Sequence, residues 1–325
     1  MRHHLGALVA IGLSLATAGA QAATPSAADI VTGFNAFTLG NFSTGHDVEG
    51  PAIVGGTLSG NGTFMNLGVP LGITLAGFGS VNVFGSAGTS SFNANGLVVK
   101  VGAANSGSSF SGAASVTYNA SFPATKTDMW NQITTLSAGL SGLVPTSTAL
   151  PTAGSNNAVI NAVPGTVNGF ANVAVIDITA ALLGSYPSLS VALNGATTVI
   201  INVSGNYAAQ PNWQNGAAWR NNVIWNFESA TSVALGATGI QGTVLAPLAH
   251  VSNGTPIDGG LFAASYTGNG ELHYKPFAGS TGLLNSFGSG GGQQSNVSTP
   301  EPASLALLGA GAAALGLLRR RRTGI

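Results

Sequence analysis

Three stretches of this 325-residue chain repeat one short pattern. They are VEGPAIV (48–54), IQGTVLA (240–246) and IDGGLFA (257–263). In each, a β-branched residue is followed by Glu, Gln or Asp, then by glycine, and after one variable position by three mostly apolar residues. The second and third copies are offset by 17 residues, a suitable length for one turn of a β-helix with three short strands and three corners. The repeat therefore favours a solenoid, and we expect its glycine to supply a corner conformation that other residues resist.

Short β-branched runs between Gly, Asn and Ser turns fill most of the remaining chain. They predict strands at 80–85, 96–102, 114–121, 173–179, 197–205 and 222–227. With 48 glycines and only 6% charged residues, the chain suits tight turns around an apolar interior. It has no cysteine, so burial and backbone hydrogen bonds must hold the fold. We predict an all-β chain that forms a right-handed parallel β-helix.

One segment, 125–143, breaks the β pattern. Its apolar residues recur at helical spacing: Met129 or Trp130, Ile133, Leu136, Leu140 and Leu143. We expect Thr127 to cap the helix and Asp128 to lie in its first turn. The pattern predicts an amphipathic helix over about 126–141 that lays its apolar stripe along the coil. The alternative of a membrane-surface helix lacks the basic face that it would need.

His46, Asp47 and Glu49 form a polar group in a chain with few charges. Glu49 occupies the same repeat position as Gln241 and Asp258, so this position requires a hydrogen-bonding side chain rather than an ionised acid. We interpret Glu49 as structural, and His46 and Asp47 as solvated on a turn. A His–Asp pair could act as a general base, but no nucleophile motif accompanies it.

The first 22 residues have the features of a secretory signal peptide. A short basic start precedes an apolar run from Leu5 to Leu15 and small residues at Ala20 and Ala22. We expect signal peptidase to cleave between Ala22 and Ala23, so the mature protein is secreted.

The C-terminal end carries three adjacent features. The triplet Pro300, Glu301 and Pro302 precedes 16 apolar residues (303–318), which are followed by Arg319, Arg320, Arg321 and Arg322. The apolar run is just short of the ~20 residues that span a bilayer comfortably, and the arginines would hold that end in the cytoplasm. This order resembles the PEP-CTERM sorting signal of Gram-negative bacteria. The resemblance implies an exosortase partner, a transient anchor in the inner membrane, and a setting of exopolysaccharide and biofilm. A simple tail anchor is the alternative.

Three longer segments resemble the choice-of-anchor A domain of bacterial surface proteins. They are FNAFTLGNFSTGHDVEGPAIVGGTLSGNGTF (34–64), VIWNFESATSVAL (223–235) and GIQGTVLAPLAHVSNGTPIDGGLFAASYTGNGELHYKPF (239–277). The resemblance implies an ice-binding-like or adhesin-like β-helix with a flanking helix, and it brings no catalytic residues. We therefore assign 1–22 to the signal peptide, 23–279 to the domain, 280–299 to a Gly/Ser-rich linker and 300–325 to the sorting signal.

The charge of the mature body limits its partners. Without the two ends, four basic residues (Lys100, Lys126, Arg220 and Lys275) face eight acidic ones. The resulting net charge near −4, with no basic patch, argues against a nucleic-acid partner.

We predict no metal and no cofactor. His46, His250 and His273 do not have the spacing of a zinc motif. If Glu49 and Asp258 stack along one corner, they could hold calcium with backbone carbonyls, but the regular Asp-rich repeat typical of such sites is absent from the sequence.

Polysaccharide cleavage is the main alternative function, because extracellular β-helices include such enzymes. These sites need clustered acids, and anionic substrates need basic residues in a groove. The few scattered basic residues of the body argue against this function, so we predict a non-catalytic protein.

The segment 207–227 concentrates aromatic residues. Trp225 and Phe227 alternate on a predicted strand and should face the core. Trp213 and Trp219 lie in a loop rich in Asn and Gln, where exposed rings could stack on sugars or on a partner. We predict these two as binding residues, and the alternative is that they pin the loop to the coil. An ice-binding face is not expected, because threonines are scattered through the sequence.

Together these features predict a secreted, exosortase-sorted protein of the cell surface or extracellular matrix of a Gram-negative bacterium. We expect an adhesive or structural component that contacts exopolysaccharide or other matrix proteins in a biofilm.

Overall fold

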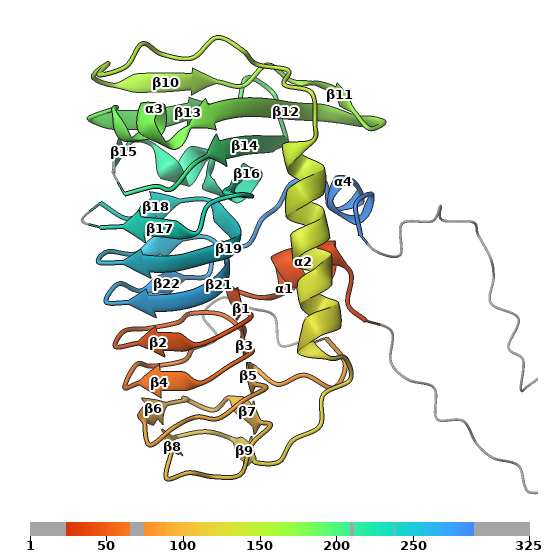
Figure 1. The fold of residues 1–325 in the computed structure, drawn as a ribbon, viewed down its shortest axis with the longest axis vertical. Helices are drawn as coiled ribbons and strands as arrows, with labels where there is room; N and C mark the ends of the chain where they lie inside the picture. The colour runs from red at the N-terminus through yellow and green to blue at the C-terminus, as the bar shows by residue number, and fades with distance from the viewer. Residues whose placement is uncertain (1–23, 66–74, 209–210, 237, 289–325) are drawn as a thin grey trace, which may run out of the picture. The chain divides into compact units, whose positions relative to one another are not determined.

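The computed structural model describes residues 24–65, 75–208, 211–236 and 238–288. Within them the chain forms stacked coils of short, mostly parallel strands with helices along one side (Figure 1). This confirms the prediction of a parallel β-helix with a flanking helix. The predicted signal peptide and sorting signal lie outside the described residues. None of the helices in the described ranges is long and apolar enough to cross a membrane.

The N-terminal strands wind a first set of coils after helix α1 (Ala27–Gly33). They are β1 (Ala36–Thr38), β2 (Phe42–Thr44), β3 (Ala52–Val54), β4 (Leu58–Gly60), β5 (Val81–Val83), β6 (Ser91–Asn93), β7 (Val98–Val101), β8 (Ser109–Ser111) and β9 (Ser115–Thr117). On one side, β1, β3, β5, β7 and β9 pair in parallel in that order. The predicted strands at 80–85, 96–102 and 114–121 are confirmed as β5, β7 and β9.

Helix α2 (Lys126–Ser141) then carries the chain along the stack, and the C-terminal strands build a second set of coils (Figure 1). These strands are β10 (Ala158–Asn161), β11 (Gly165–Val167), β12 (Phe170–Thr179), β13 (Ser188–Ala192), β14 (Thr198–Ser204), β15 (Asn212–Trp213), β16 (Val223–Asn226), β17 (Ser232–Leu235), β18 (Ile240–Gln241), β19 (Thr243–Asn253), β20 (Ile257–Asp258), β21 (Leu261–Gly268) and β22 (Leu272–His273). Helix α3 (Ala180–Gly184) and two short 3₁₀ turns, Gly216–Ala218 and Arg220–Asn222, lie between them. The other three predicted strands are confirmed as β12, β14 and β16.

The last coils of the second set pair with the first coil of the first set. Ala36 of β1 aligns with Leu261 of β21 on one side and with Ala52 of β3 on the other. On the neighbouring side of the stack, Phe42 of β2 aligns with Tyr266 of β21. We call this joint the seam. The two sets of coils come from the N-terminal and C-terminal parts of the sequence, and the seam joins them into one continuous stack.

The stack has three sides. The helix face consists of β12, β14, β16, the first halves of β19 and β21, and β1, β3 and β5, against which the helices pack. The ladder face consists of β17, the second halves of β19 and β21, β2 and β4. The third side carries β18, β20 and β22, and continues across the seam to the bridged residue Val48.

Helix α2 buries the apolar stripe that its spacing predicts. Its buried residues are Met129, Trp130, Ile133, Leu136, Ser137 and Leu140. They meet outward residues of the helix face, where the rings of Phe37 and Trp130 pack edge to face with centroids 4.9 Å apart. The predicted cap at Thr127 is wrong. The cap lies two residues earlier: Thr125, whose backbone is extended, accepts from the amide of Asp128, and the helix begins at Lys126, as predicted.

The repeat that predicted the coil is confirmed in register. Ile240 aligns with Ile257, and Gln241 with Asp258. The expected reason for the corner glycine holds only in part, because Gly242 has a positive φ of 107° and Gly50 does not. At Gly50, a Cβ atom would clash with the ring of Tyr274, so this glycine is required by lack of space.

The start of the predicted linker is wrong. Helix α4 (Thr281–Asn285) lies within it, and the folded unit extends to Gly288. Leu283 and Leu284 are buried, and the side-chain oxygen of Asn285 accepts from the amide of Ala28 in α1 at 3.1 Å. The glycines and serines of this segment predicted a spacer. The segment instead packs on the domain through its two adjacent leucines.

Candidate functional site

The predicted binding tryptophans belong to a packed cluster. Trp213 lies 5.1 Å from Trp225 and 6.0 Å from Trp219, measured between ring centroids. Trp219 is only 1% exposed, and its indole nitrogen donates to the carbonyl of Gln214 at 3.0 Å. A ring in that position has no free face for a ligand, so the assignment of Trp219 as a contact residue is wrong. The loop folds back over the coil through its two 3₁₀ turns, and Trp219 pins it there.

Trp213 is half-buried and donates to the carbonyl of Gly239 at 2.6 Å. Its role as a contact residue stays a prediction. Trp225 and Phe227 are fully buried, which confirms that they face the core.

A polar column runs along the third side of the stack and crosses the seam. We define the corner column as Gln241, Asp258, His273 and Glu49. Asp258 aligns with Gln241 and with His273, and the Val48–Leu272 bridge places Glu49 after His273. Glu49 and Asp258 therefore share one corner, as the repeat predicted. They are not neighbours, because His273 lies between them.

The side chain of His273 is held from both sides. Its Nδ1 atom lies 2.5 Å from Asp258 Oδ1, and its Nε2 atom lies 2.7 Å from Glu271 Oε2 and 3.9 Å from Glu49 Oε1. Burial alone would lower the pKa of His273, but the hydrogen bonds with Glu271 and Asp258 and the charges of Asp258 and Glu49 outweigh it. The pKa of His273 is therefore raised above its ordinary value.

Two cations contact acidic members of the column. Arg220 Nη1 donates to Asp258 Oδ2 at 2.9 Å, and Lys275 Nζ lies 3.8 Å from Glu49 Oε2. Glu49 also accepts from the backbone amide of Tyr274 at 3.0 Å. This supports the structural interpretation of Glu49. The described residues contain no group of His, Asp and Glu side chains arranged to hold a metal ion.

The ladder face carries a row of small, mostly hydroxyl-bearing side chains. Ser252 aligns with Thr267, Thr267 with Ser43, and Ser43 with Ser59, so the row crosses the seam. The adjacent buried residues, such as Val251 and Tyr266, point into the core, because side chains alternate along a strand. Parallel strands are about 4.8 Å apart, so these hydroxyls repeat at that spacing.

A second, shorter row lies beside the first. Ser232 aligns with His250 and His250 with Ser265, and His250 Nδ1 lies 2.8 Å from the Ser265 hydroxyl. The scattered threonines of the sequence do not predict this surface, in which serines and a histidine also take part. The residues of the ladder face are far apart in the sequence at irregular intervals, because the coils differ in length. They become neighbours only when the strands pair in register.

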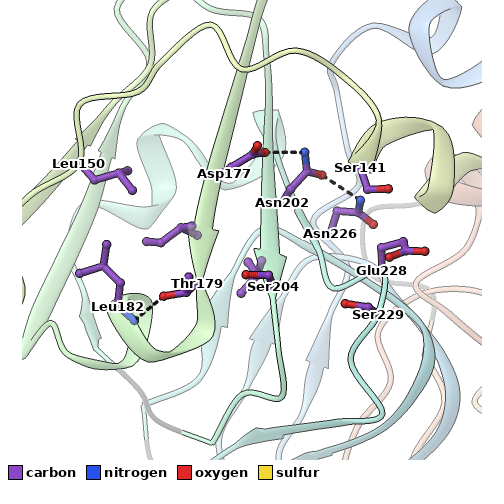
Figure 2. Close-up of a pocket in the computed structure, with 12 residues that line it drawn as sticks. Ser141, Leu150, Asp177, Thr179, Leu182, Asn202, Ser204, Asn226, Glu228 and Ser229 are labelled. Carbon is purple, nitrogen blue, oxygen red and sulfur yellow. Dashed lines mark hydrogen bonds between the residues drawn. The ribbon is translucent and has the colours of Figure 1, made fainter.

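A pocket of about 390 Å³ opens where three strands of the helix face end (Figure 2). Asp177 of β12, Asn202 of β14 and Asn226 of β16 are in register across it. Asn202 donates to Asp177 at 3.0 Å, and Asn226 donates to Asn202 at 2.9 Å. Ser137 of α2 donates to Asn226 at 2.6 Å, which ties this row to the helix.

The rest of the pocket lining combines polar and apolar groups. The polar members include Ser141, Thr179, Ser204, Glu228 and Ser229. Leu150, Ile178, Leu182 and Val203 form apolar parts of the wall. The pocket could not be predicted from the sequence, because its two carboxylates belong to different coils and no motif links them.

Two family models match the chain. Residues 27–274 match a family described as the ice-binding-like adhesive domain, and residues 298–322 match the PEP-CTERM protein-sorting motif. Among solved structures, the chain is similar to an ice-binding protein from an Antarctic ascomycete, Antarctomyces psychrotrophicus. That match has 16% identity and a TM-score of 0.30, and covers 76% of this chain and 95% of the other. The search of curated proteins gave no match.

Proposed function

Because the chain belongs to the family of ice-binding-like adhesive domains, we propose that it is a non-catalytic adhesin that binds extracellular polysaccharide through its ladder face. The PEP-CTERM motif makes it an exported, exosortase-sorted protein of the surface or the extracellular space. We further propose a Gram-negative host, an inner-membrane anchor before processing, and a place in the biofilm matrix. The more specific name of choice-of-anchor A domain remains part of this proposal.

The observation that carries the proposal is the row of Ser252, Thr267, Ser43 and Ser59. A hydroxyl can both donate and accept, so the row offers regularly spaced partners to a hydroxyl-rich polymer. The strands beneath fix the spacing before binding, which lowers the entropy lost on contact. Each contact is weak, but a polymer that engages many of them gains avidity.

The position of the helices supports the same surface. Helix α4, which precedes the last described residue, packs on α1 at the helix face. The ladder face is another side of the stack, formed by β17, β2, β4 and the second halves of β19 and β21, and the helix residues buried on the helix face do not belong to it. We infer that the protein can be tethered beyond α4 while its ladder face stays open.

The test compares retention of the exported protein on immobilised native exopolysaccharide. The double variant Thr267→Arg/Ser59→Arg should lose at least tenfold in affinity, because bulky charged side chains interrupt the row. Thr135→Arg/Ala138→Arg adds the same two charges on the exposed face of α2 and should bind normally. Equal binding by the ladder variant and wild type, with matching melting curves, would remove the ladder face from the proposal.

Two further measurements test the other parts of the proposal. Deletion of 300–325 should change the ratio of surface-bound to released protein, and an unchanged ratio contradicts sorting by the tail. Incubation of wild type with the same polysaccharide should release no reducing ends. Release that is lost in Asp177→Asn or Glu228→Gln would instead support the alternative of a polysaccharide-degrading enzyme.

A further inference from the structure

The pocket in Figure 2 is acidic and has no counter-charge of its own. Asp177 and Glu228 both line it, and none of the body's lysines or its arginine does. Within the described part of the chain, neither carboxylate takes part in an ion pair. Asp177 accepts one side-chain hydrogen bond, from Asn202, and Glu228 accepts none from the described residues. Both carboxylates therefore keep free acceptor positions that face a cavity.

The two carboxylates belong to strands that are not adjacent. Asp177 lies on β12, and Glu228 follows the end of β16, two strands away. At about 4.8 Å per strand, their backbones are roughly 10 Å apart. Within the described part of the chain, no group of three or more His, Asp or Glu side chains could hold a metal ion, and the pocket adds none. The spacing suits an extended ligand that presents positive charge and further polar groups.

The remaining lining fits a sugar ring. Hydroxyls of Ser141, Ser204 and Ser229 can exchange hydrogen bonds with sugar hydroxyls, while Leu150 and Leu182 offer apolar surface to the carbon-bound hydrogens of the ring. A volume of about 390 Å³ lies within the range of small-molecule sites, about 300–1,000 Å³. Neither a simple polyamine nor an inorganic cation would use the apolar wall and the hydroxyls together.

The pocket is also rigid at its base. Asn226 is 1% exposed, donates to the carbonyl of Ser137 at 2.9 Å and accepts from the hydroxyl of that serine. Asn202 donates to the carbonyl of Leu140 at 3.1 Å, near the end of α2. These bonds hold the row beneath Asp177 in place, so a ligand meets groups that are already positioned.

We propose that this pocket binds an amino-sugar unit of a polysaccharide, with the protonated amine held by Asp177 or Glu228 and the ring against the apolar wall. The site is separate from the ladder face and does not depend on it. A ligand of this class is an incompletely acetylated glucosamine polymer. Its amines complement the carboxylates, and its hydroxyls complement the serines.

The test uses two oligosaccharides of equal length, a glucosamine tetramer and its fully N-acetylated counterpart. They share one backbone, and only the first carries positive charges. Calorimetry with the folded protein, at a pH where the amine is protonated, should show binding of the glucosamine tetramer and at least tenfold weaker binding of the acetylated form. Spermidine, a cation without a sugar ring, should also bind at least tenfold more weakly.

Variants assign the binding to the pocket. Asp177→Asn and Glu228→Gln keep the shape of each side chain, and at least one should weaken glucosamine tetramer binding tenfold or more while the melting curve stays unchanged. Asp47→Asn removes the same charge from a half-buried side chain outside the pocket and should bind normally. The ladder variant Thr267→Arg/Ser59→Arg should also bind the tetramer normally, so failure of the ladder face and failure of the pocket remain distinguishable.

Several results would overturn the inference. Equal affinity for the acetylated tetramer means that the charge plays no part, and equal affinity for spermidine means a general cation site. No measurable binding of the glucosamine tetramer removes the site. If Asp47→Asn weakens binding of the glucosamine tetramer as much as the pocket variants do, the binding depends only on the net charge of the domain.

Discussion

The side-chain amide of Asn35, in the first coil, donates to the carbonyl of Gly259 at 2.9 Å across the seam. The same side chain also donates to the carbonyl of His273 at 3.2 Å and accepts from the amide of Gly50 at 3.1 Å. Asn35 is fully buried, so no solvent can replace these partners. The two sets of coils are therefore joined by a side chain that satisfies backbone groups from both.

Asn35→Ala should destabilise the protein by about 2–4 kcal/mol, because at least two buried backbone groups lose their only side-chain partner. Urea unfolding followed by circular dichroism measures the change. The exposed Asn156→Ala should shift the free energy of unfolding by less than about 0.5 kcal/mol. Equal midpoints for the two variants would mean that the seam is held by strand pairing alone.

Stability should depend on pH through His273. The pKa of this residue is raised in the folded protein by hydrogen bonds with Glu271 and Asp258 and by nearby negative charges, which together exceed the opposite effect of burial. A group whose pKa rises on folding stabilises fully below its unfolded pKa, and that contribution is lost as pH rises through the folded pKa. The urea midpoint should therefore fall as pH increases above about 6.5, the pKa of histidine in an unfolded chain.

His273→Gln should flatten this pH dependence while keeping one hydrogen-bonding side chain in the corner column. His46→Gln, at an exposed position, should leave the slope unchanged. A steeper fall of the midpoint towards acid in the wild type, over the same range, would contradict the sign derived for His273.

Glu49→Gln and Gly50→Ala should differ sharply although the residues are neighbours. Glutamine can still accept from the amide of Tyr274, so Glu49→Gln should cost less than about 1 kcal/mol. Alanine at position 50 places a methyl group against the ring of Tyr274 and near the Cβ atom of Asn35, which should cost about 1–3 kcal/mol. Thermal unfolding gives both values, and a loss of polysaccharide binding in Glu49→Gln at an unchanged melting temperature would contradict the structural interpretation.

The sequence predicted those features that depend on local pattern. Gln241 and Asp258 could be aligned in advance because each is followed by glycine and apolar residues at a fixed offset. His273 stands in the next coil of the same column, but Tyr274 follows it where the other copies have glycine, so the pattern does not extend to it. The expectation that each corner glycine supplies an unusual backbone conformation was wrong for Gly50. This glycine is required because a side chain would clash with Tyr274, and its φ is not positive.

Long-range order could not be read from the sequence. Thr267 and Ser43 become neighbours only because the last coils dock on the first, and nothing local in either segment signals that pairing. The same holds for the pocket, whose residues Asp177 and Glu228 are brought together by strands that end at the same edge of the stack. The tryptophans were misjudged because a polar loop sequence does not reveal that 3₁₀ turns fold it back onto the coil.

Trp219→Ala and Trp213→Ala separate a structural role from a contact role. Trp219 is 1% exposed and packs within 6.4 Å of Trp225, measured between ring centroids, so its removal should leave a cavity and cost about 3–5 kcal/mol. Trp213 is half-buried, and its removal should cost less, because solvent can fill part of the space.

Thermal melting and retention on native exopolysaccharide are measured on the same samples. If Trp213→Ala weakens retention at an unchanged melting temperature, its exposed edge contacts the polymer; if melting and retention fall together, both rings pin the loop. Normal stability of Trp219→Ala would contradict the buried position from which its structural role is argued.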